Sequence, residues 1–527
     1  MIVWRTGGIL FLALTALVGC SHNPNSAAVL AADAITAEKA RMDMAYLASD
    51  ELQGRNTPSP QLDSAAAYIA RKFARSGLRP VDGSYLQPVK LNIVALGEQN
   101  GLRIRREGKE IPYEIKKDFV PFEMTASGEV RSSVVFAGYG ISAPEYTYDD
   151  YAAIDVRGKI VLVLRHEPGE DDTASVFKGR VLTSHANVDT KVRVAREHGA
   201  IGVLVVTDPL NHTTLTPRGF PWPSLSKTIP HDALPTTLGA DEGSKIPVVQ
   251  VGESVIAQLF GSVDSLKAIQ AAIDGSMKPN SFPVRGTEVW IQTSTRIKEM
   301  VANNVVGYLE GSDPVLKNQL VVVGAHYDHV GHTKQRPGGE DSIYNGADDN
   351  ASGTVALLGV ASGLGALRDR PKRSVLLIAF AGEEKGLFGS EAYARNPLFP
   401  LDSTVAMLNM DMVGRNDLDS LQLIGGALAP DLLRITMEEN ARVGFTLEDA
   451  RLAFGGSDHM SFTKRKVPSL FFHSGLHPEY HQVTDEAKLI NNDKVARTAT
   501  LVFFVALRVA NEPARPRYVG QPVSLLP

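Results

Sequence analysis

The sequence predicts an α/β protein in which a mainly parallel sheet is flanked by helices and a second, β-rich domain is inserted into the chain. Strand-like apolar runs alternate with helical patterns across 303–511, which is typical of a parallel sheet with helices on both faces. The stretch 120–285 is instead rich in short apolar strands. The length of 527 residues also exceeds what one hydrophobic core usually organises, so more than one domain is expected.

The amino terminus has the pattern of an export signal. Arg5 precedes an apolar run at 9–18, which is shorter than the roughly 20 apolar residues that cross a bilayer. Residues 1–20 are therefore interpreted as a signal peptide. The last four of them, LVGC, resemble the bacterial lipobox, whose cysteine is acylated, and Cys20 is the only cysteine of the chain. The resemblance implies export and a lipid anchor on Cys20 in the bacterial cell envelope; an incidental cysteine is the alternative.

The residues after Cys20 predict a tether over 21–34, and Ser21 is more typical of lipoproteins sorted to the outer membrane. Helical periodicity from residue 35 to about residue 90, interrupted by turn residues at 52–58, predicts two helices, and 35–119 is predicted to be the first part of the main domain. The inserted domain is predicted at 120–285 and the rest of the main domain at 286–511. Prolines in 512–527 predict a tail along the surface. The clearest strands of the main domain are 320–324, 374–380, 405–410 and 468–472, and its helices are 352–367, 432–443 and 494–510.

Charged side chains follow the predicted strands of the main domain. Open parallel sheets bind ligands beyond the carboxyl ends of their strands, so these side chains are expected to converge. Alone, a histidine after a strand or a Glu-Glu pair is usually ordinary structure, but their recurrence at one end of the sheet predicts a site. Imidazoles and carboxylates together suit zinc. The residues are His326, Asp328, Asp349, Glu383, Glu384, Asp411 and His481.

Five ordered motifs resemble peptidase family M28. They are GAHYD at 324–328, GADDNASG at 346–353, GEEKGLFGS at 382–390, NMDMVG at 409–414 and YH at 480–481. The inserted segment resembles a protease-associated (PA) domain through DVRGKIVLV at 155–163 and IPVV at 246–249. The resemblance implies a zinc-exopeptidase fold, two zinc ions per chain and peptide substrates.

The resemblance also implies a role for each residue of the motifs. His326 and Asp411 would bind one zinc ion, Glu384 and His481 the other, and Asp349 rather than Asp348 would bridge them. Glu383 would act as the general base, and Tyr480 would donate to the oxyanion. Asp328 would orient His326 by accepting its N–H, as Asp485 would for His481.

An aminopeptidase is the first expectation, and three alternatives stay open. A carboxypeptidase would need an arginine for the substrate carboxylate, for which Arg415 and Arg451 are candidates. A glutaminyl-cyclase-like enzyme normally uses one zinc ion, and a non-catalytic receptor would have lost ligands. The net charge of -5 makes nucleic acid an unexpected partner. His166-Glu167 does not begin an HExxH motif, because Glu170 stands where the second histidine is required.

Overall fold

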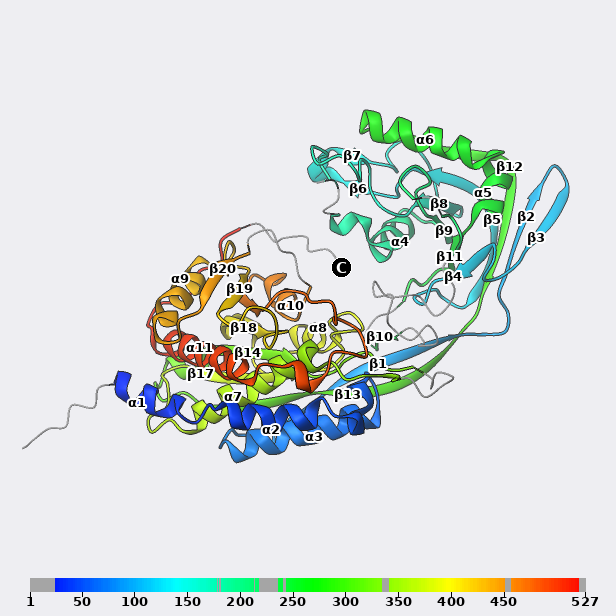
Figure 1. Cartoon of the computed structure of the whole chain (residues 1–527). Helices are drawn as coiled ribbons and strands as arrows, with labels where there is room; N and C mark the ends of the chain where they lie inside the picture. Colours follow the sequence, from blue (N-terminus) through cyan, green and yellow to red (C-terminus); the bar gives the residue numbers. More distant parts are fainter. Residues whose placement is uncertain are drawn as a thin grey trace, which may run out of the picture.

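The computed structural model describes residues 24–520 except 178, 180–181, 213, 218–235, 240–242, 334–340 and 451–455. The chain forms two lobes that are joined by long strands (Figure 1). The signal peptide predicted at 1–20 and Arg451 lie outside the described residues. No helix in the part of the chain that the structure describes is long and apolar enough to cross a membrane.

The first lobe is built on a mixed nine-stranded sheet. Its central strands β17, β14, β18 and β21 are parallel to one another, whereas β1 and β13 run antiparallel at one side. The predicted α/β fold is confirmed, with parallel pairing where the charged side chains were expected. In spatial order the strands are β10 (Thr236–Leu238), β1 (Leu86–Leu96), β13 (Thr295–Leu309), β17 (Ser374–Phe380), β14 (Leu320–His326), β18 (Thr404–Met410), β21 (Ser469–His473), β19 (Ser420–Ile424) and β20 (Thr446–Asp449).

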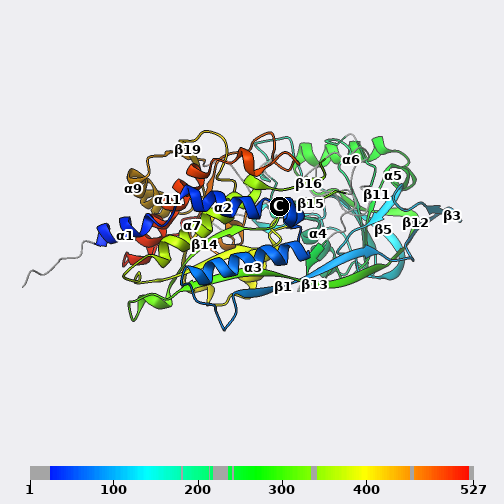
Figure 2. The same ribbon diagram turned by 60° about the horizontal axis from the view of Figure 1, so that its bottom comes forward.

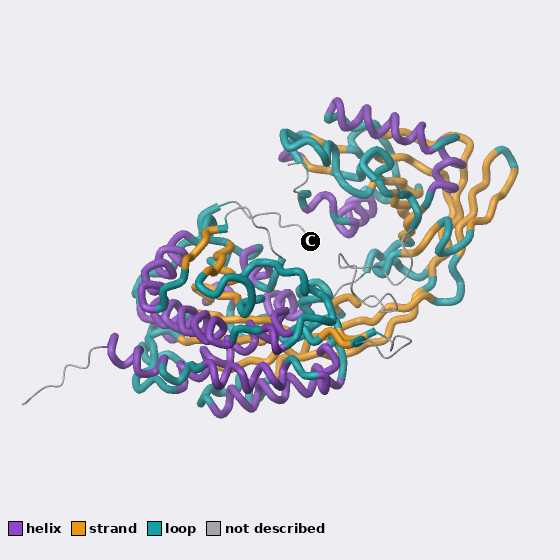
Figure 3. Tube along the Cα trace, in the orientation of Figure 1, coloured by secondary structure: helices purple, strands orange, loops and turns teal. Residues whose placement is uncertain are grey.

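Helices cover both faces of this sheet, as the tube view shows (Figure 3). Val321 and Val323 of β14 belong to the core beneath α2, α3, α7 and α11, whereas Val322 belongs to a smaller core on the opposite face with Tyr393 of α8. Burial on both faces explains why the central strands are continuously apolar. The helices of this lobe are α1 (Pro24–Ala32), α2 (Ala37–Leu47), α3 (Pro60–Arg75), α7 (Gly353–Gly365), α8 (Phe388–Arg395), α9 (Pro430–Glu439), α10 (His459–Thr463) and α11 (Asn492–Asn511).

The second lobe contains a mixed eight-stranded sheet. Its middle strands β5, β8, β9 and β11 are parallel, and the other neighbours pair antiparallel. The strands in spatial order are β3 (Lys109–Tyr113), β2 (Gly101–Arg106), β12 (Ser281–Thr293), β5 (Gly128–Ala137), β8 (Ile160–Leu164), β9 (Gly202–Val206), β11 (Val248–Val251) and β4 (Phe119–Pro121). Its helices are α4 (Val188–Glu197), α5 (Glu253–Phe260) and α6 (Val263–Ser276). Two-stranded hairpins are β6 (Ser142–Ala143) with β7 (Tyr148–Asp149), and, in the first lobe, β15 (Gly331–His332) with β16 (Ile343–Tyr344).

The inserted lobe is larger than the predicted 120–285. Strands β2 and β3 precede residue 120 and β12 continues to Thr293, yet all three belong to the second sheet. The chain leaves the first lobe at Gly97 and finally re-enters it at Ser294, where the Gly97 N–H donates to the Ser294 carbonyl at 2.7 Å. Between these points only β10 among the described strands returns to the first sheet, where it pairs with β1. The prediction missed this boundary because β2 buries only two of its residues, alternating with exposed charged ones, and β3 buries none, so neither strand has a strong apolar pattern.

The described parts of the predicted tether and of the predicted tail lie against the first lobe. Part of the predicted tether forms helix α1, whose Ala31 is 2% exposed and belongs to the main core, so 24–32 is not an extended linker. Within the predicted tail, Arg517 forms two bonds of 2.9 Å to the Asp431 carboxylate on α9. Helices α2 and α3 lie side by side on one face of the lobe (Figure 2).

Candidate metal centre

Three neighbouring parallel strands bring the first group of site residues together. His326 ends β14 and lies opposite Phe380 of β17 in the register. Glu383 and Glu384 follow β17 directly. On the other side of β14, Gly324 pairs with Asn409 of β18, so Asp411 stands level with His326. The register alone therefore places these four side chains at one edge of the sheet.

Asp349 reaches the same edge from the turn that leads into α7. The turn begins at Gly346, whose φ of 54° is left-handed, and a Cβ there would lie 2.4 Å from the ring of His329. A side chain at this position is excluded both by backbone conformation and by space. Glycine thus lets the turn approach the strand end closely enough for Asp349 to enter the site.

Asp349 stands between two histidines. Its Oδ1 lies 3.4 Å from His326 Nε2, and its Oδ2 lies 2.9 Å from His481 Nε2. His326 Nε2 is also 3.3 Å from Asp411 Oδ2, and His481 Nε2 is 3.1 Å from Glu384 Oε2. The side chains thus form two donor groups with one carboxylate in common. That these groups hold two zinc ions bridged by Asp349, as the resemblance implies, stays a prediction.

The donor atoms fit metal ions better than a hydrogen-bonded cluster. His326 Nε2, His481 Nε2 and Asp411 Oδ1 are buried and form no well-aligned hydrogen bond among the described residues, although carboxylate oxygens lie 2.9 to 3.4 Å from the two nitrogens. Buried polar atoms normally form a hydrogen bond. Burial lowers the pKa of His481, but the carboxylates of Glu384 and Asp349 outweigh it and raise that pKa to about 11. The same negative field favours divalent cations, and the nitrogen and oxygen donors suit zinc.

Glu383 lies beside this centre. Its Oε2 is 3.9 Å from His326 Nε2, and the side chain is largely buried. Burial raises the pKa of Glu383 well above its usual range, and the carboxylates of Glu384 and Asp411 raise it further. A carboxylate with a raised pKa can take a proton and hold it, as a general base must before passing it on.

The Asp328 carboxylate was predicted to accept the ring N–H of His326, but its contacts in the structure are different. The His326 Nδ1 atom lies 3.2 Å from the Asp328 backbone carbonyl and 3.6 Å from the Asp328 carboxylate. The carboxylate instead accepts from the Glu383 N–H at 3.1 Å and from Thr57 Oγ1 at 3.0 Å. Asp328 therefore orients His326 through its main chain and fixes the backbone of Glu383 through its side chain.

Asp485 supports the turn rather than His481. Its carboxylate accepts from the backbone N–H groups of Asp348 and Asp349 at 3.0 to 3.1 Å. The prediction that it orients His481 was wrong, because Asp485 lies under the turn that carries Asp349. Asp348 faces away from the donor groups and accepts from the Gly414 N–H at 2.7 Å.

His329 was missed by the sequence prediction. It is fully buried, and its Nδ1 lies 2.7 Å from Glu384 Oε1 and 3.7 Å from Asp349 Oδ2. By closeness of potential ligand atoms, His329 belongs with Asp349, Glu384 and His481, and a second cluster contains His326, Glu383 and Asp411. Glu383 is thus close enough to be a ligand, although the prediction gives it the role of general base. The position of His329 three residues after His326 was the available signal.

A buried arginine from the N-terminal segment holds the site loops in place. Arg55 donates to the backbone carbonyls of Leu47, Tyr327, Asn345 and Gly346, and it is 1% exposed. Burial lowers its pKa to about 10, while Asp328 and Asp349 act in the opposite direction. The segment before the inserted lobe therefore supports the loops that carry the metal-site residues.

Tyr480 lies at the rim. Its ring stacks on that of His481 with centroids 3.9 Å apart, and the residue is 37% exposed. Burial of the ring, together with nearby Asp349 and Glu384, raises the pKa of the phenol. The hydroxyl thus stays protonated and able to donate at neutral pH, as the predicted oxyanion role requires.

Residues 304–506 match the sequence profile of peptidase family M28. This stretch is an M28 peptidase domain. A second match, to the PA domain, covers 127–259 within the second lobe. The M28 domain contains all of the donor residues described above, and the fold is that of a zinc exopeptidase with a PA insertion.

Individual proteins resemble both the sequence and the fold. Aminopeptidase NAALADL1 of Mus musculus is 27% identical over 347 residues, which are 56% of this chain and 43% of that protein. A probable leucine aminopeptidase of Trichophyton verrucosum is 29% identical over 208 residues, which are 37% of this chain and 56% of that protein. The chain thus spans about half the length of the curated relatives it matches. The structure of an aminopeptidase from Aneurinibacillus sp. strain AM-1 aligns with a TM-score of 0.55 at 20% identity, covering 95% of this chain and 98% of that one, which shows the shared fold.

Proposed function

We propose that this chain is an aminopeptidase that uses two zinc ions to hydrolyse the first peptide bond of peptides. The observation that carries the proposal is the position of Asp349 between His326 and His481. Asp411 lies beside the first histidine and Glu384 beside the second, and Glu383 lies 3.9 Å from His326. A receptor that had lost catalysis would lack part of this set. The names of the relatives from Mus musculus and Trichophyton verrucosum agree with this activity.

Different residues of the M28 domain would bind the zinc ions, transfer the proton and stabilise the oxyanion. His326 and Asp411 would hold one zinc ion, Glu384 and His481 the other, and Asp349 would bridge them, with His329 orienting Glu384 at 2.7 Å. Two bound zinc ions would lower the pKa of water and polarise the scissile carbonyl. Glu383 takes the proton of the attacking water and delivers it to the leaving amine. Tyr480 donates to the oxygen on which negative charge develops.

Cleavage at the amino terminus of the substrate, rather than at its carboxyl terminus, is supported by the ion pair that Arg415 forms. Its Nη2 donates to the Glu479 carboxylate at 2.8 Å, and the arginine side chain is 16% exposed. An arginine neutralised in this way is a poor clamp for a substrate carboxylate, whereas the acidic centre attracts a substrate ammonium group.

A time course with a mixed peptide pool tests the proposal. We expect the zinc-loaded chain from residue 21 onward to remove residues stepwise from amino termini, and N-acetylation and chelation to stop it. Mass spectrometry of the pool follows each product. Trimming from the carboxyl end would show a carboxypeptidase instead, and formation of pyroglutamate would show a glutaminyl-cyclase-like enzyme. No reaction by metal-loaded, folded protein would favour a non-catalytic receptor.

We further propose that the chain is exported and held in the bacterial envelope, at the outer membrane, by a lipid on Cys20. The only cysteine stands at the end of a lipobox-like sequence, and one acyl chain is worth about 0.8 kcal/mol per buried CH₂. Replacing Cys20 with alanine is expected to move the protein from the membrane fraction to the soluble fraction and to abolish labelling by an alkyne fatty acid. If the variant fractionates as the natural chain does, and the natural chain is not labelled, the proposed lipid anchor is refuted.

A further inference from the structure

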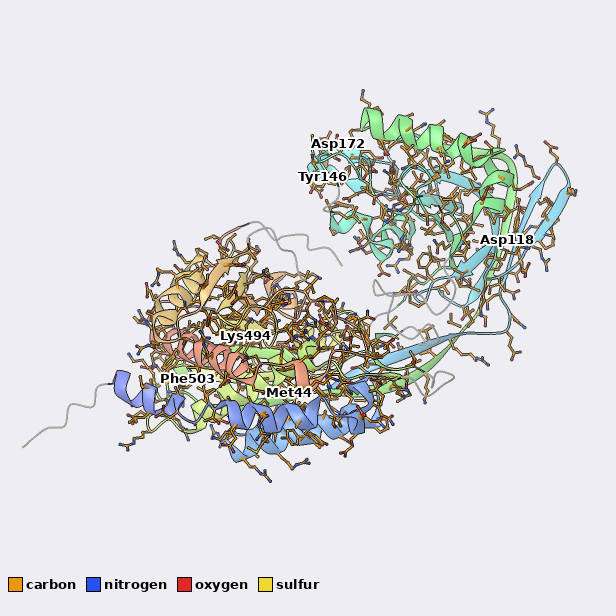
Figure 4. The ribbon with its side chains drawn as sticks, in the orientation of Figure 1. Met44, Asp118, Tyr146, Asp172, Lys494 and Phe503 are labelled. Atoms are coloured by element: carbon orange, nitrogen blue, oxygen red, sulfur yellow. The ribbon has the colours of Figure 1, made fainter. Side chains whose placement is uncertain are left out.

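The PA lobe contains a second group of histidines and carboxylates that the proposed peptidase chemistry does not use. We call it the PA cluster, and it consists of His166, Glu170, Asp208 and His212. One potential ligand atom from each of the four residues lies within 4.8 Å of all the others. The residues belong to the lobe that also carries Tyr146 and Asp172 (Figure 4), far along the chain from the M28 site.

The parallel sheet of the PA lobe creates this cluster by its register. Leu164 of β8 pairs with Val206 of β9. His166 and Asp208 each follow their strand end by two residues, so they emerge side by side. Each has a complementary partner four residues later, Glu170 for His166 and His212 for Asp208. The His212 N–H also donates to the Asp208 carbonyl at 3.1 Å, which folds the second loop back toward the first.

The spacing of the donor atoms fits a tetrahedral ion. Glu170 Oε2 lies 3.6 Å from His166 Nδ1 and 3.1 Å from His212 Nε2. Ligands that sit about 2.0 to 2.2 Å from a tetrahedral zinc ion are separated from one another by roughly 3.3 to 3.6 Å. The separation of Glu170 and His166 falls within this range, and that of Glu170 and His212 lies just below it. His166 Nδ1 also contacts Asp208 Oδ2 more closely than two ligands of one ion would lie, so these two side chains must move apart to admit an ion between them.

Asp208 provides an independent indication of a ligand. The residue is 0% exposed, and its Oδ1 has no hydrogen-bond partner among the described residues. A buried carboxylate oxygen without a partner is costly. The nearby cation Lys191 directs its Nζ to the backbone carbonyls of Tyr139 and His166, and no bond from Lys191 to the Asp208 carboxylate is among those that the structure describes.

We propose that the PA cluster binds one zinc-like divalent cation through His166, Glu170, Asp208 and His212. Four protein ligands leave no open position, which is the character of a structural rather than a catalytic site. The ion would join the loop after β8 to the loop after β9 and so stabilise the carboxyl edge of the PA sheet. This site does not depend on the proposed peptidase activity.

The site can be tested by measuring how much zinc the chain from residue 21 onward binds, with and without a substitution in the PA cluster. After equilibration with buffered free zinc and gel filtration, the natural chain is expected to hold one more zinc ion than the His212→Gln variant. His212 is suited to the test because its side chain is 35% exposed, so the substitution disturbs little packing. Aminopeptidase turnover of the variant should stay unchanged, and its thermal midpoint in zinc should lie below that of the natural chain, because one bound ion is lost.

A matched control comes from the same lobe. His185 Nε2 lies 2.7 Å from Glu145 Oε1, but this pair has no further metal-binding partner in the described clusters. His185→Gln should therefore keep the zinc content of the natural chain, while Asp208→Asn should lower it by one. If natural chain and His212→Gln bind equal zinc, the four residues are only a hydrogen-bonded group and the proposal is overturned. If His185→Gln also loses an ion, the assignment of ligands is overturned.

Discussion

Replacing Glu383 with glutamine is expected to lower kcat by about 10² to 10⁴ while the chain keeps both zinc ions of the M28 site. Glutamine has nearly the shape of glutamate but cannot accept the proton of the attacking water. Because the side chain lies 3.9 Å from His326 without belonging to the predicted ligand set, metal binding should survive. Turnover of an amino-terminal substrate and zinc content by elemental analysis measure the two effects on the same sample.

The adjacent Glu384 offers the sharpest control for this prediction. Its carboxylate lies 3.1 Å from His481 and 2.7 Å from His329, within one donor group. Glu384→Gln is therefore expected to lose zinc as well as activity. Full activity in the Glu383 variant, or loss of zinc from it equal to that of the Glu384 variant, would show that the base and the ligand have been assigned wrongly.

Replacing Asp349 with asparagine is expected to impair both zinc sites at once. Each oxygen of this carboxylate faces a different histidine, at 3.4 and 2.9 Å, so one neutral amide removes charge from both donor groups. At zinc concentrations that saturate the natural chain, the variant should hold less than one zinc ion in the M28 domain. Turnover should fall by at least about 10²-fold, as for the Glu383 variant.

Asp348→Asn is the matched comparison, because it changes the preceding residue of the same turn. Asp348 accepts from the Gly414 N–H and lies 3.3 Å from His477, outside both donor groups. This variant should keep its zinc, although its thermal stability should fall. Equal zinc loss in the two variants would mean that the turn as a whole, rather than the bridging carboxylate, determines metal binding.

Strands and helices of the M28 domain were predictable because each has a strong local pattern. The strand predicted at 374–380 coincides with β17 (Ser374–Phe380), and the helix predicted at 494–510 lies within α11 (Asn492–Asn511). Both elements are buried over most of their length, so their apolar periodicity is nearly complete. The motif positions of the candidate ligands were equally visible, since they follow directly from the strand ends.

Side-chain partners were less predictable, because contacts between distant segments leave no local signal. Asp485 braces the turn of Asp349 across 136 positions, and Arg55 reaches Gly346 across 291. The carboxylate of Asp328 holds the Glu383 backbone rather than His326, a choice that depends on where the two loops meet. The boundary of the inserted lobe was missed for a similar reason, since β2 joins its sheet only by pairing with β12.

The α/β fold, the presence of an inserted domain and the residue types of a zinc centre could be predicted without coordinates, because apolar periodicity and motif order are local properties of the chain. The positions of Asp349 between two histidines, of His329 beside Glu384, and of His166 near His212 emerge only in the folded molecule. They depend on the register of parallel strands. It sets which strand ends lie side by side, and only then do residues far apart in the chain come within bonding distance.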